Sequence, residues 1–174
     1  MKYLKVFLLS LFLLLNYLKA NSSENINDIK SLLEGRYELV YWTENKTRYD
    51  YPEVAGVLVI SNDNALITMD KNMNSNKSLE LIGWGRYKIN SRSFHIGWHD
   101  WKLLLIENNI KTVKKKSPWK GLREYSVALK ENKLVLTSLT GKQSWELDKK
   151  SLVYKDKEWG EEKDEVIRYW KRIE

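Results

Sequence analysis

The pattern of apolar residues changes at Gly35. Before this glycine, apolar residues recur at helical spacing, at Ile26, Ile29, Leu32 and Leu33. After it, β-branched and aromatic residues follow one another closely, which is typical of a strand. The chain is therefore predicted to form a short helix through Leu33, followed by strands. Because this helix has a single apolar stripe, it must lie against another part of the fold. In a closed barrel it would cover one open end.

From Arg36 onward, short strand-like runs alternate with turn residues, which favours an antiparallel sandwich or barrel. Tight hairpins are expected at Asn62-Asp63-Asn64, Asn108-Asn109 and Glu131-Asn132, because these residue types tolerate turn conformations. The polar run from Asp70 to Lys77 is predicted to be a mobile loop. The predicted strands are 36–44, 54–61, 65–69, 79–89, 93–98, 101–106, 110–113, 122–129, 133–139, 142–148, 151–155 and a final element from Val166.

The final element is compatible with two structures. Val166, Ile167, Trp170 and Ile173 fit helical spacing, but the alternation of Val166 and Trp170 with their neighbours also fits a strand. A strand is favoured because it can pair with the first strand and remove both edges of the sheet. No helical pattern of about 10–15 residues separates the strands, which disfavours parallel βαβ folds.

The N-terminus predicts export. Residues 1–20 contain Lys2 and Lys5, then the apolar run 6–15, and are interpreted as a cleaved signal peptide. The alternative, a retained anchor, is disfavoured because the run is shorter than the roughly 20 residues that span a membrane. The chain has no cysteine, so there is no usual acceptor for a bacterial lipid anchor. Residues 21–174 are expected to form one soluble domain, in the periplasm or outside the cell.

The charge of the chain argues against a nucleic-acid partner. Removing the three lysines of the predicted signal peptide from the formal net charge of +7 leaves a mild excess of +4. The densest basic run, 111–116, is interpreted as a solvated loop. A nucleic-acid groove would need a longer basic stripe with interleaved aromatic residues. Weak contact with an anionic envelope surface remains an alternative.

Several motifs resemble one family. Gly35-Arg36-Tyr37 after a short helix resembles the Gly-x-Trp opening of lipocalins, with Tyr in place of Trp. Leu33 to Val40 and then Gly56 to Ile60, with Pro52 before it, are similar to the first two strands of the bacterial lipocalin-like domain family. Further similar segments follow in the same order, over nearly the whole mature chain, at 85–89, Phe94-His95-Ile96, 117–125 and Trp170-Lys171-Arg172. The sequence departs from the family pattern at Tyr37, in an insertion-like stretch from Trp98 to Lys116, and in a longer charged run before the last strand.

This resemblance implies an all-β fold, namely an antiparallel up-and-down β-barrel of about 8–10 strands with an internal cavity and a short capping helix. It also implies that Arg172 packs over the ring of Tyr37. Many such proteins hold small apolar molecules, but the resemblance carries over no catalytic residue. Following the lipocalin-like opening, Tyr37, Leu39 and Tyr41 are expected to face inward, and Val40 and Trp42 outward.

The aromatic content supplies the candidate site. The chain has eight tryptophans and ten tyrosines. Aromatic walls with a few donors would bind an amphipathic molecule, and Arg123 or Arg86 would meet a carboxylate or phosphate group. The candidate ligand-binding residues are Tyr41, Arg86, Tyr87, His95, Arg123, Tyr125 and Trp145. The alternative is that large rings fill the barrel and leave no cavity.

Other chemistry is less well supported. His95 and His99 are the two histidines, and in a strand positions four apart are separated by about 13 Å, so no metal site is predicted. The chain has no cysteine and no nucleophile elbow, and the acidic run 161–165 is interpreted as a solvated loop. No catalytic residue and no cofactor are predicted.

The sequence thus favours an exported, monomeric lipocalin-like protein that binds a small apolar or amphipathic ligand in the barrel lumen. The alternative is an envelope structural or interaction protein with a filled barrel and a contact region from Trp98 to Trp119. A third possibility is a lumenal isomerase or cyclase that uses His95 for proton transfer.

Overall fold

A computed structural model describes residues 26–74, 76–115, 120–160 and 163–173. The predicted signal peptide and Trp119 lie outside the described residues. The first described element is a helix at residues 26–33. The strands that follow are β1 (Gly35–Glu44), β2 (Thr47–Asp50), β3 (Val54–Ser61), β4 (Asn64–Asn74), β5 (Lys77–Ile89), β6 (Ser93–Glu107), β7 (Ile110–Lys114), β8 (Arg123–Lys130), β9 (Lys133–Ser138), β10 (Gln143–Leu147), β11 (Ser151–Trp159) and β12 (Asp164–Arg172).

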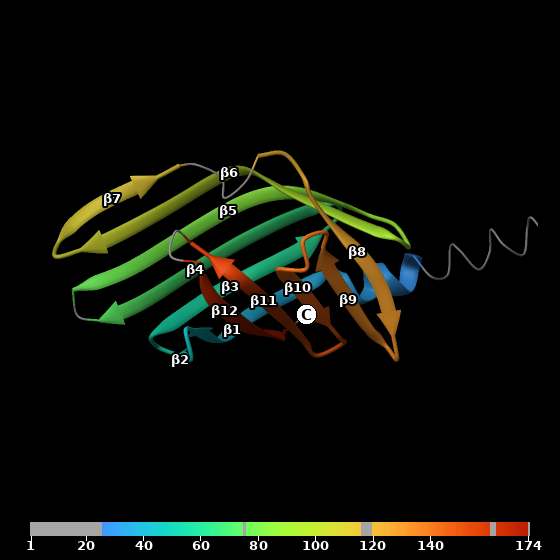
Figure 1. Ribbon diagram of the computed structural model, residues 1–174, viewed down its shortest axis with the longest axis horizontal. Helices are drawn as coiled ribbons and strands as arrows, with labels where there is room; N and C mark the ends of the chain where they lie inside the picture. The colour runs from blue at the N-terminus through green and yellow to red at the C-terminus, as the bar shows by residue number, and fades with distance from the viewer. Residues whose placement is uncertain (1–25, 75, 116–119, 161–162, 174) are drawn as a thin grey trace, which may run out of the picture.

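The strands form a closed antiparallel barrel, as predicted (Figure 1). Ten of the described strands make the ring in chain order, β1-β3-β4-β5-β6-β8-β9-β10-β11-β12, while β2 and β7 pair only at its margin, with β1 and β6. The final element is a strand, which confirms the favoured interpretation. It pairs with β1 from Tyr37 opposite Arg172 to Glu44 opposite Val166, and this ladder closes the ring.

The N-terminal helix covers one end of the barrel, as expected from its apolar stripe (Figure 1). Ile29, Leu32 and Leu33 are buried in the same cluster as the core residues of the strands. The hydroxyl of Tyr37 donates to the carbonyl oxygens of Leu32 and Leu33 at 3.0 Å each. These bonds satisfy carbonyls at the C-terminal end of the helix and fix it to β1. No described helix has the length and apolar character needed to cross a membrane.

The predicted hairpin turns are confirmed by their backbone angles. Two consecutive residues have positive φ at Asn62-Asp63, Asn108-Asn109 and Glu131-Asn132. This conformation matches the twist of the flanking strands, and Asn and Asp tolerate it better than most residues. Asn45-Lys46 forms a further turn of the same kind, which creates β2, a strand that the sequence analysis missed.

Two predicted loops are strand instead. The segment from Asp70 to Lys77 was expected to be a mobile loop, but β4 continues through Asn74 and pairs with the start of β5. The run contains no apolar residue at the inward position that follows Ile67 and Met69, so its strand pattern was hidden. Lys71 occupies that position and is buried. Likewise, the predicted strands 93–98 and 101–106 are a single strand, β6. Its pairing with β5 shifts by one residue between Trp84 and Gly85, which leaves His99 in a bulge.

The wall of the barrel is continuous at the helix end and divided at the other end. β1 pairs with β3 only over Gly35–Glu38, and from Tyr41 onward it pairs with β2 instead. In the same way β6 pairs with β8 only over Ser93–Ile96 and then continues beside β7. We therefore distinguish a first half, β3–β7, from a second half, β8–β12 with β1 and β2. Figure 1 shows β5, β6 and β7 extending well beyond β8 and β9.

Candidate functional site

The interior of the barrel contains a cavity of about 40 Å³ between the two halves. Its lining is aromatic and aliphatic, with one charged side chain, two tyrosines and the indole N–H groups of the tryptophans as the polar components. The lining residues are Leu58, Ile67, Met69, Trp98, Trp101, Tyr125, Trp145, Leu152, Tyr154, Trp159, Arg168 and Trp170. Most of them are buried, whereas Trp98 and Trp159 are half-buried.

The bulge in β6 brings two tryptophans to the cavity. Trp98 and Trp101 are three residues apart, a spacing that would place them on opposite faces of a regular strand. Because His99 is an extra residue in the strand, the side chains of Trp98 and Trp101 both lie on the inner face. Their ring centroids are 5.3 Å apart. Gly83 on β5 faces Trp101, and a Cβ at this glycine would lie 2.6 Å from the indole ring. The missing side chain therefore makes room for Trp101 against the wall.

Arg168 is the charged residue of the cavity. It lies on β12 between Tyr154 of β11 and Trp42 of β1, and only 4% of its surface is exposed. The guanidinium carbon is 4.1 Å from the ring centroid of Trp42 and 4.0 Å from that of Trp159. Among the described groups, no partner hydrogen bonds with Nε or Nη2, which are both fully buried. Burial lowers the pKa of Arg168 to about 10, so the side chain is still a cation at neutral pH.

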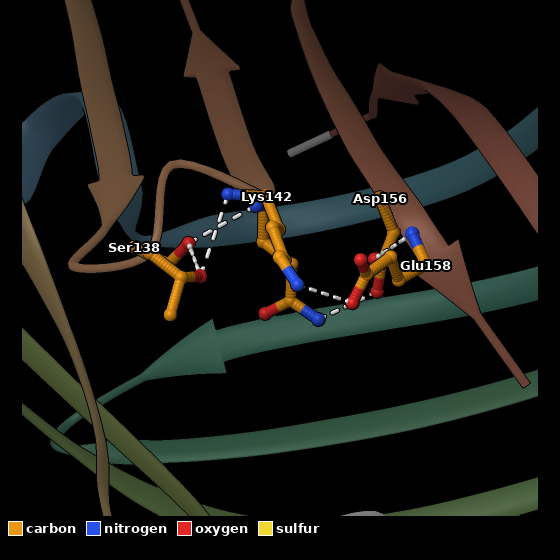
Figure 2. Close-up of polar contacts among 6 residues, drawn as sticks. Ser138, Lys142, Asp156 and Glu158 are labelled. Atoms are coloured by element: carbon orange, nitrogen blue, oxygen red, sulfur yellow. Dashed lines mark hydrogen bonds and ion pairs between the residues drawn. The ribbon is translucent and has the colours of Figure 1, made fainter. Parts of the chain in front are cut away.

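The nearest buried acid, Asp156, is occupied by other donors (Figure 2). Its carboxylate accepts hydrogen bonds from Nε2 of Gln143 at 2.5 Å and from the amide of Glu158 at 3.0 Å. It also accepts one from the hydroxyl of Tyr154 at 2.8 Å, which the figure does not draw. Gln143 in turn accepts a hydrogen bond from the hydroxyl of Tyr125 at 2.7 Å. This network fixes both cavity-lining phenols. Burial raises the pKa of Tyr125 to about 12 and that of Tyr154 well above its usual value.

A second buried cation, Lys71, joins the two halves of the barrel away from the helix. Its ammonium group, on β4, pairs with the carboxylate of Glu44 on β1. The same nitrogen lies 4.8 Å from the ring centroid of Trp42 and 4.2 Å from that of Tyr49. Burial and the positive charge of Arg168 lower the pKa of Lys71 to about 8. Unlike Arg168, Lys71 has a carboxylate partner.

Four of the predicted ligand-binding residues face the interior. Tyr125 and Trp145 line the cavity. Tyr87 is buried, but its hydroxyl donates to Oε1 of Glu34 at 2.6 Å. It therefore contacts the residue that follows the N-terminal helix and does not line the cavity. Arg123 is half-buried on the same face of β8 as Tyr125, and it is not part of the cavity lining.

The other three predicted residues do not reach the lumen. The β1–β12 register shifts between Leu39 and Tyr41, and this bulge reverses the faces beyond it. Trp42 is therefore buried, whereas Tyr41 lies outside and stacks on Tyr169 with 5.3 Å between ring centroids. Arg86 is exposed because its neighbours on β5 take the inward positions. His95 alternates with buried residues of β6 and lies 3.2 Å from the hydroxyl of Ser93, so the expectation of a lumenal histidine is wrong.

Arg168 was not among the predicted site residues, although its strand carries a signal for it. Read as a strand, β12 places Val166, Arg168, Trp170 and Arg172 on one face, and this face is the inner one. An arginine flanked on its own face by valine and tryptophan is unusual enough to mark a special position. The two tryptophans proposed for an external contact region, Trp98 and Trp101, instead line the cavity.

Comparisons of the chain with models of known protein families, with curated proteins and with solved structures give no match. In the described part of the chain, no cluster of three or more histidine and acidic side chains could hold a metal ion. The arrangement of the residues themselves defines a closed β-barrel with an aromatic interior cavity and a buried cation in its wall.

Proposed function

We propose that this protein is an exported, lipocalin-like barrel that acts as a monomer and binds a small apolar or amphipathic molecule in its lumen. The observation that supports this proposal is the convergence of aromatic rings from both halves of the barrel on one interior cavity. A packed scaffold needs no such cavity, because protein interiors normally leave few voids larger than a water molecule.

The size of the cavity restricts the ligand. Its volume of about 40 Å³ is enough for a few water molecules. It is smaller than the roughly 150 Å³ of an apolar cavity that binds benzene. A larger ligand therefore requires the half-buried rings of Trp98 or Trp159 to turn away. Both residues lie beside irregular pairing, at the bulge of β6 and at the register shift near the end of β11.

The lumenal site is tested with 1-aminoanthracene, a neutral fluorescent probe of apolar cavities. We expect binding at a one-to-one stoichiometry that quenches tryptophan fluorescence. Leu152→Phe places extra volume at a buried cavity-lining position and should weaken binding at least tenfold. The matched control is Leu66→Phe, because Leu66 lies on the outer face of β4. Equal binding to both variants, or no binding to the unmodified chain, would overturn the proposal.

Export is tested separately. The protein is recovered from cells that produce the full chain, and its mass and N-terminal sequence are determined. Cleavage near Ala20 and recovery from the periplasm or medium are expected. An intact N-terminus at Met1 in the cytosolic fraction would contradict this part of the proposal.

A second candidate function, contact with an envelope partner, is favoured by an apolar patch on the outer face. Leu66, Ile82 and Trp84 occupy adjacent outward positions of β4 and β5 and are 40% to 48% exposed. Such a contiguous group of exposed apolar side chains is a feature of contact surfaces. Co-sedimentation with isolated cell envelopes should fall in a Leu66→Ser/Trp84→Ser variant and remain unchanged in Leu152→Phe.

A further inference from the structure

The unpartnered edge of Arg168 has the geometry of an acid-binding group. Nε and Nη2 are the two nitrogens on one edge of the guanidinium, and their N–H bonds point in the same direction. This pair matches the two oxygens of a carboxylate, which accepts both hydrogen bonds at once. In Arg168 these two nitrogens are the ones left buried without a partner. The edge suited to an oxyanion is therefore the edge that the protein leaves unused.

The protein's own acids near Arg168 do not fill this role. Asp156 already accepts hydrogen bonds from Tyr154, Gln143 and the amide of Glu158, and it makes no ion pair with Arg168 in the described structure. The carboxylate of Glu44 pairs with Lys71. An isolated buried cation is strongly unfavourable unless a counter-charge or hydrogen-bond acceptors compensate for its lost hydration. The aromatic rings beside the guanidinium and the nearby charge of Asp156 offset only part of this loss, because burial still lowers the pKa of Arg168.

We propose that Arg168 binds the carboxylate of a small amphipathic acid whose apolar part occupies the aromatic cavity. This inference rests on the proposed function, since it names the class of ligand that the lumen takes. The acid carries a single negative charge because one guanidinium faces the cavity and the second buried cation, Lys71, is already paired. The walls formed by Trp101, Trp145 and Trp170 suit a planar or short aliphatic tail.

Trp159 is the residue that must move. Its ring contacts Arg168 and is half-buried, whereas Trp42 on another side of the guanidinium is fully buried. Trp159 is also the last residue of β11 and precedes Gly160, which has a φ of 73°. Displacement of this ring would remove its contact with the guanidinium of Arg168 and enlarge the cavity. Binding of the acid should therefore change the environment of the Trp159 indole.

The experiment compares acids with their uncharged amides of the same shape. Phenylacetate is paired with phenylacetamide, and octanoate with octanamide, and their affinities for the full mature chain are measured by calorimetry. We expect each acid to bind at least tenfold more tightly than its amide. In the NMR spectrum of the unmodified chain, the Nε–H signal of Arg168 should shift with phenylacetate and not with phenylacetamide.

Variants distinguish the contribution of the paired N–H donors of Arg168 from the contribution of its positive charge. Arg168→Lys keeps a cation but loses the paired donors, and it should weaken acid binding at least tenfold while changing amide binding less than twofold. Arg86→Lys is the matched control on the outer face and should change neither. Acetate and inorganic phosphate, which lack an apolar part, are expected to bind at least tenfold more weakly than phenylacetate.

The outcomes separate the two proposals. Equal affinity for acid and amide in the unmodified chain would overturn the role of Arg168 and leave lumenal binding intact. Acid binding that survives unchanged in a folded Arg168→Lys variant would also overturn it. If neither these ligands nor 1-aminoanthracene bind, the proposed function and this inference both fail. The comparison in the unmodified chain remains decisive even if Arg168→Lys does not fold.

Discussion

Arg172 of the last strand lies over the ring of Tyr37 of the first strand, with its guanidinium carbon 5.6 Å from the ring centroid. The two residues are direct partners in the ladder that closes the barrel. Both also bind the end of the N-terminal helix: Tyr37 donates to the carbonyls of Leu32 and Leu33, and Arg172 donates to those of Ser31 and Glu34. The closing ladder and the cap over the barrel are therefore held by the same pair of side chains.

Loss of the Tyr37 hydroxyl should loosen this cap. Tyr37→Phe keeps the buried ring but removes the donor to two helix carbonyls, so we expect a loss of about 1–2 kcal/mol in the free energy of unfolding. Arg172→Met should destabilise the fold to a similar extent because several carbonyls lose their partner. Urea unfolding followed by circular dichroism measures both. The control Lys171→Met changes the exposed neighbour on β12 and should shift the free energy by less than about 0.5 kcal/mol. Equal effects of Arg172→Met and Lys171→Met would contradict the assignment.

Buried tyrosines should make the protein unfold at high pH. Burial raises the pKa of Tyr37 and Tyr125 to about 12, and it also raises the pKa of Tyr87 and Tyr154. In the unfolded chain these phenols ionise near pH 10. Between pH 10 and 12 the folded state therefore binds more protons than the unfolded state, and its stability decreases as the pH rises. This contribution is fully retained below about pH 10.

Absorbance at 295 nm measures this ionisation directly. We expect part of the tyrosine signal to appear in one cooperative step that coincides with loss of the near-UV circular dichroism signal. The urea-unfolded chain, as the control, should titrate smoothly around pH 10. A smooth titration of all tyrosines in the folded protein would show that the four rings are not protected from solvent.

Gly85 is required for the contact between β5 and β6. A Cβ at this position would lie 2.1 Å from the carbonyl oxygen of Gly97, and a backbone atom cannot turn away as a side chain can. Gly85→Ala should therefore force the strands apart and destabilise the fold by about 3 kcal/mol. The neighbouring control, Arg86→Ala, changes an exposed side chain and should have little effect. Thermal unfolding of the two variants checks this, and similar melting temperatures would refute it.

Arg168 should reduce the stability of the fold in the absence of a ligand. Arg168→Met replaces a buried cation, two of whose donors have no partner, by an apolar side chain of similar length. Burial outweighs the attraction of Asp156 in the lowered pKa of Arg168, so we expect the free energy of unfolding to rise by about 1–2 kcal/mol. A residue whose role is purely structural would give the opposite sign. Urea unfolding in ligand-free buffer makes the measurement, and Arg123→Met on the same inner face provides the comparison.

Most of the fold could be predicted from the residue types found at the turns and in the strands. Turns at Asn62-Asp63 and Asn108-Asn109 depend on the residues that form them, so the sequence predicts the hairpins and the up-and-down order. Pairing of the last strand with the first could also be predicted, because a closed sheet leaves no exposed edge. The closed barrel followed from these two arguments and from the resemblance to lipocalin-like proteins, and the capping helix followed from its single apolar stripe.

The candidate site could be predicted only in part, because the inner face of each strand depends on bulges. A register shift after Leu39 turns Trp42 inward and Tyr41 outward. Another shift, at His99, places Trp98 and Trp101 on the same inner face. No glycine or proline marks the first shift at Val40, and the glycines beside the second shift, Gly85 and Gly97, do not show by themselves that His99 is the extra residue. Arg168 was not predicted for a different reason, namely that its element also fits helical spacing, and the residue shares an inner face with Val166 and Trp170 only if that element is a strand.

The division of the barrel wall determines how the lumen can change in width. Beyond Glu38 of β1 and Ile96 of β6, no ladder in the described residues joins the first half to the second, and the Lys71–Glu44 ion pair links them across this gap. Separation of that ion pair and of the side chains packed across the gap would let the halves bend about the helix end, with every ladder intact. The resistance of two short ladders to bending then limits how far the cavity can widen beyond its resting volume.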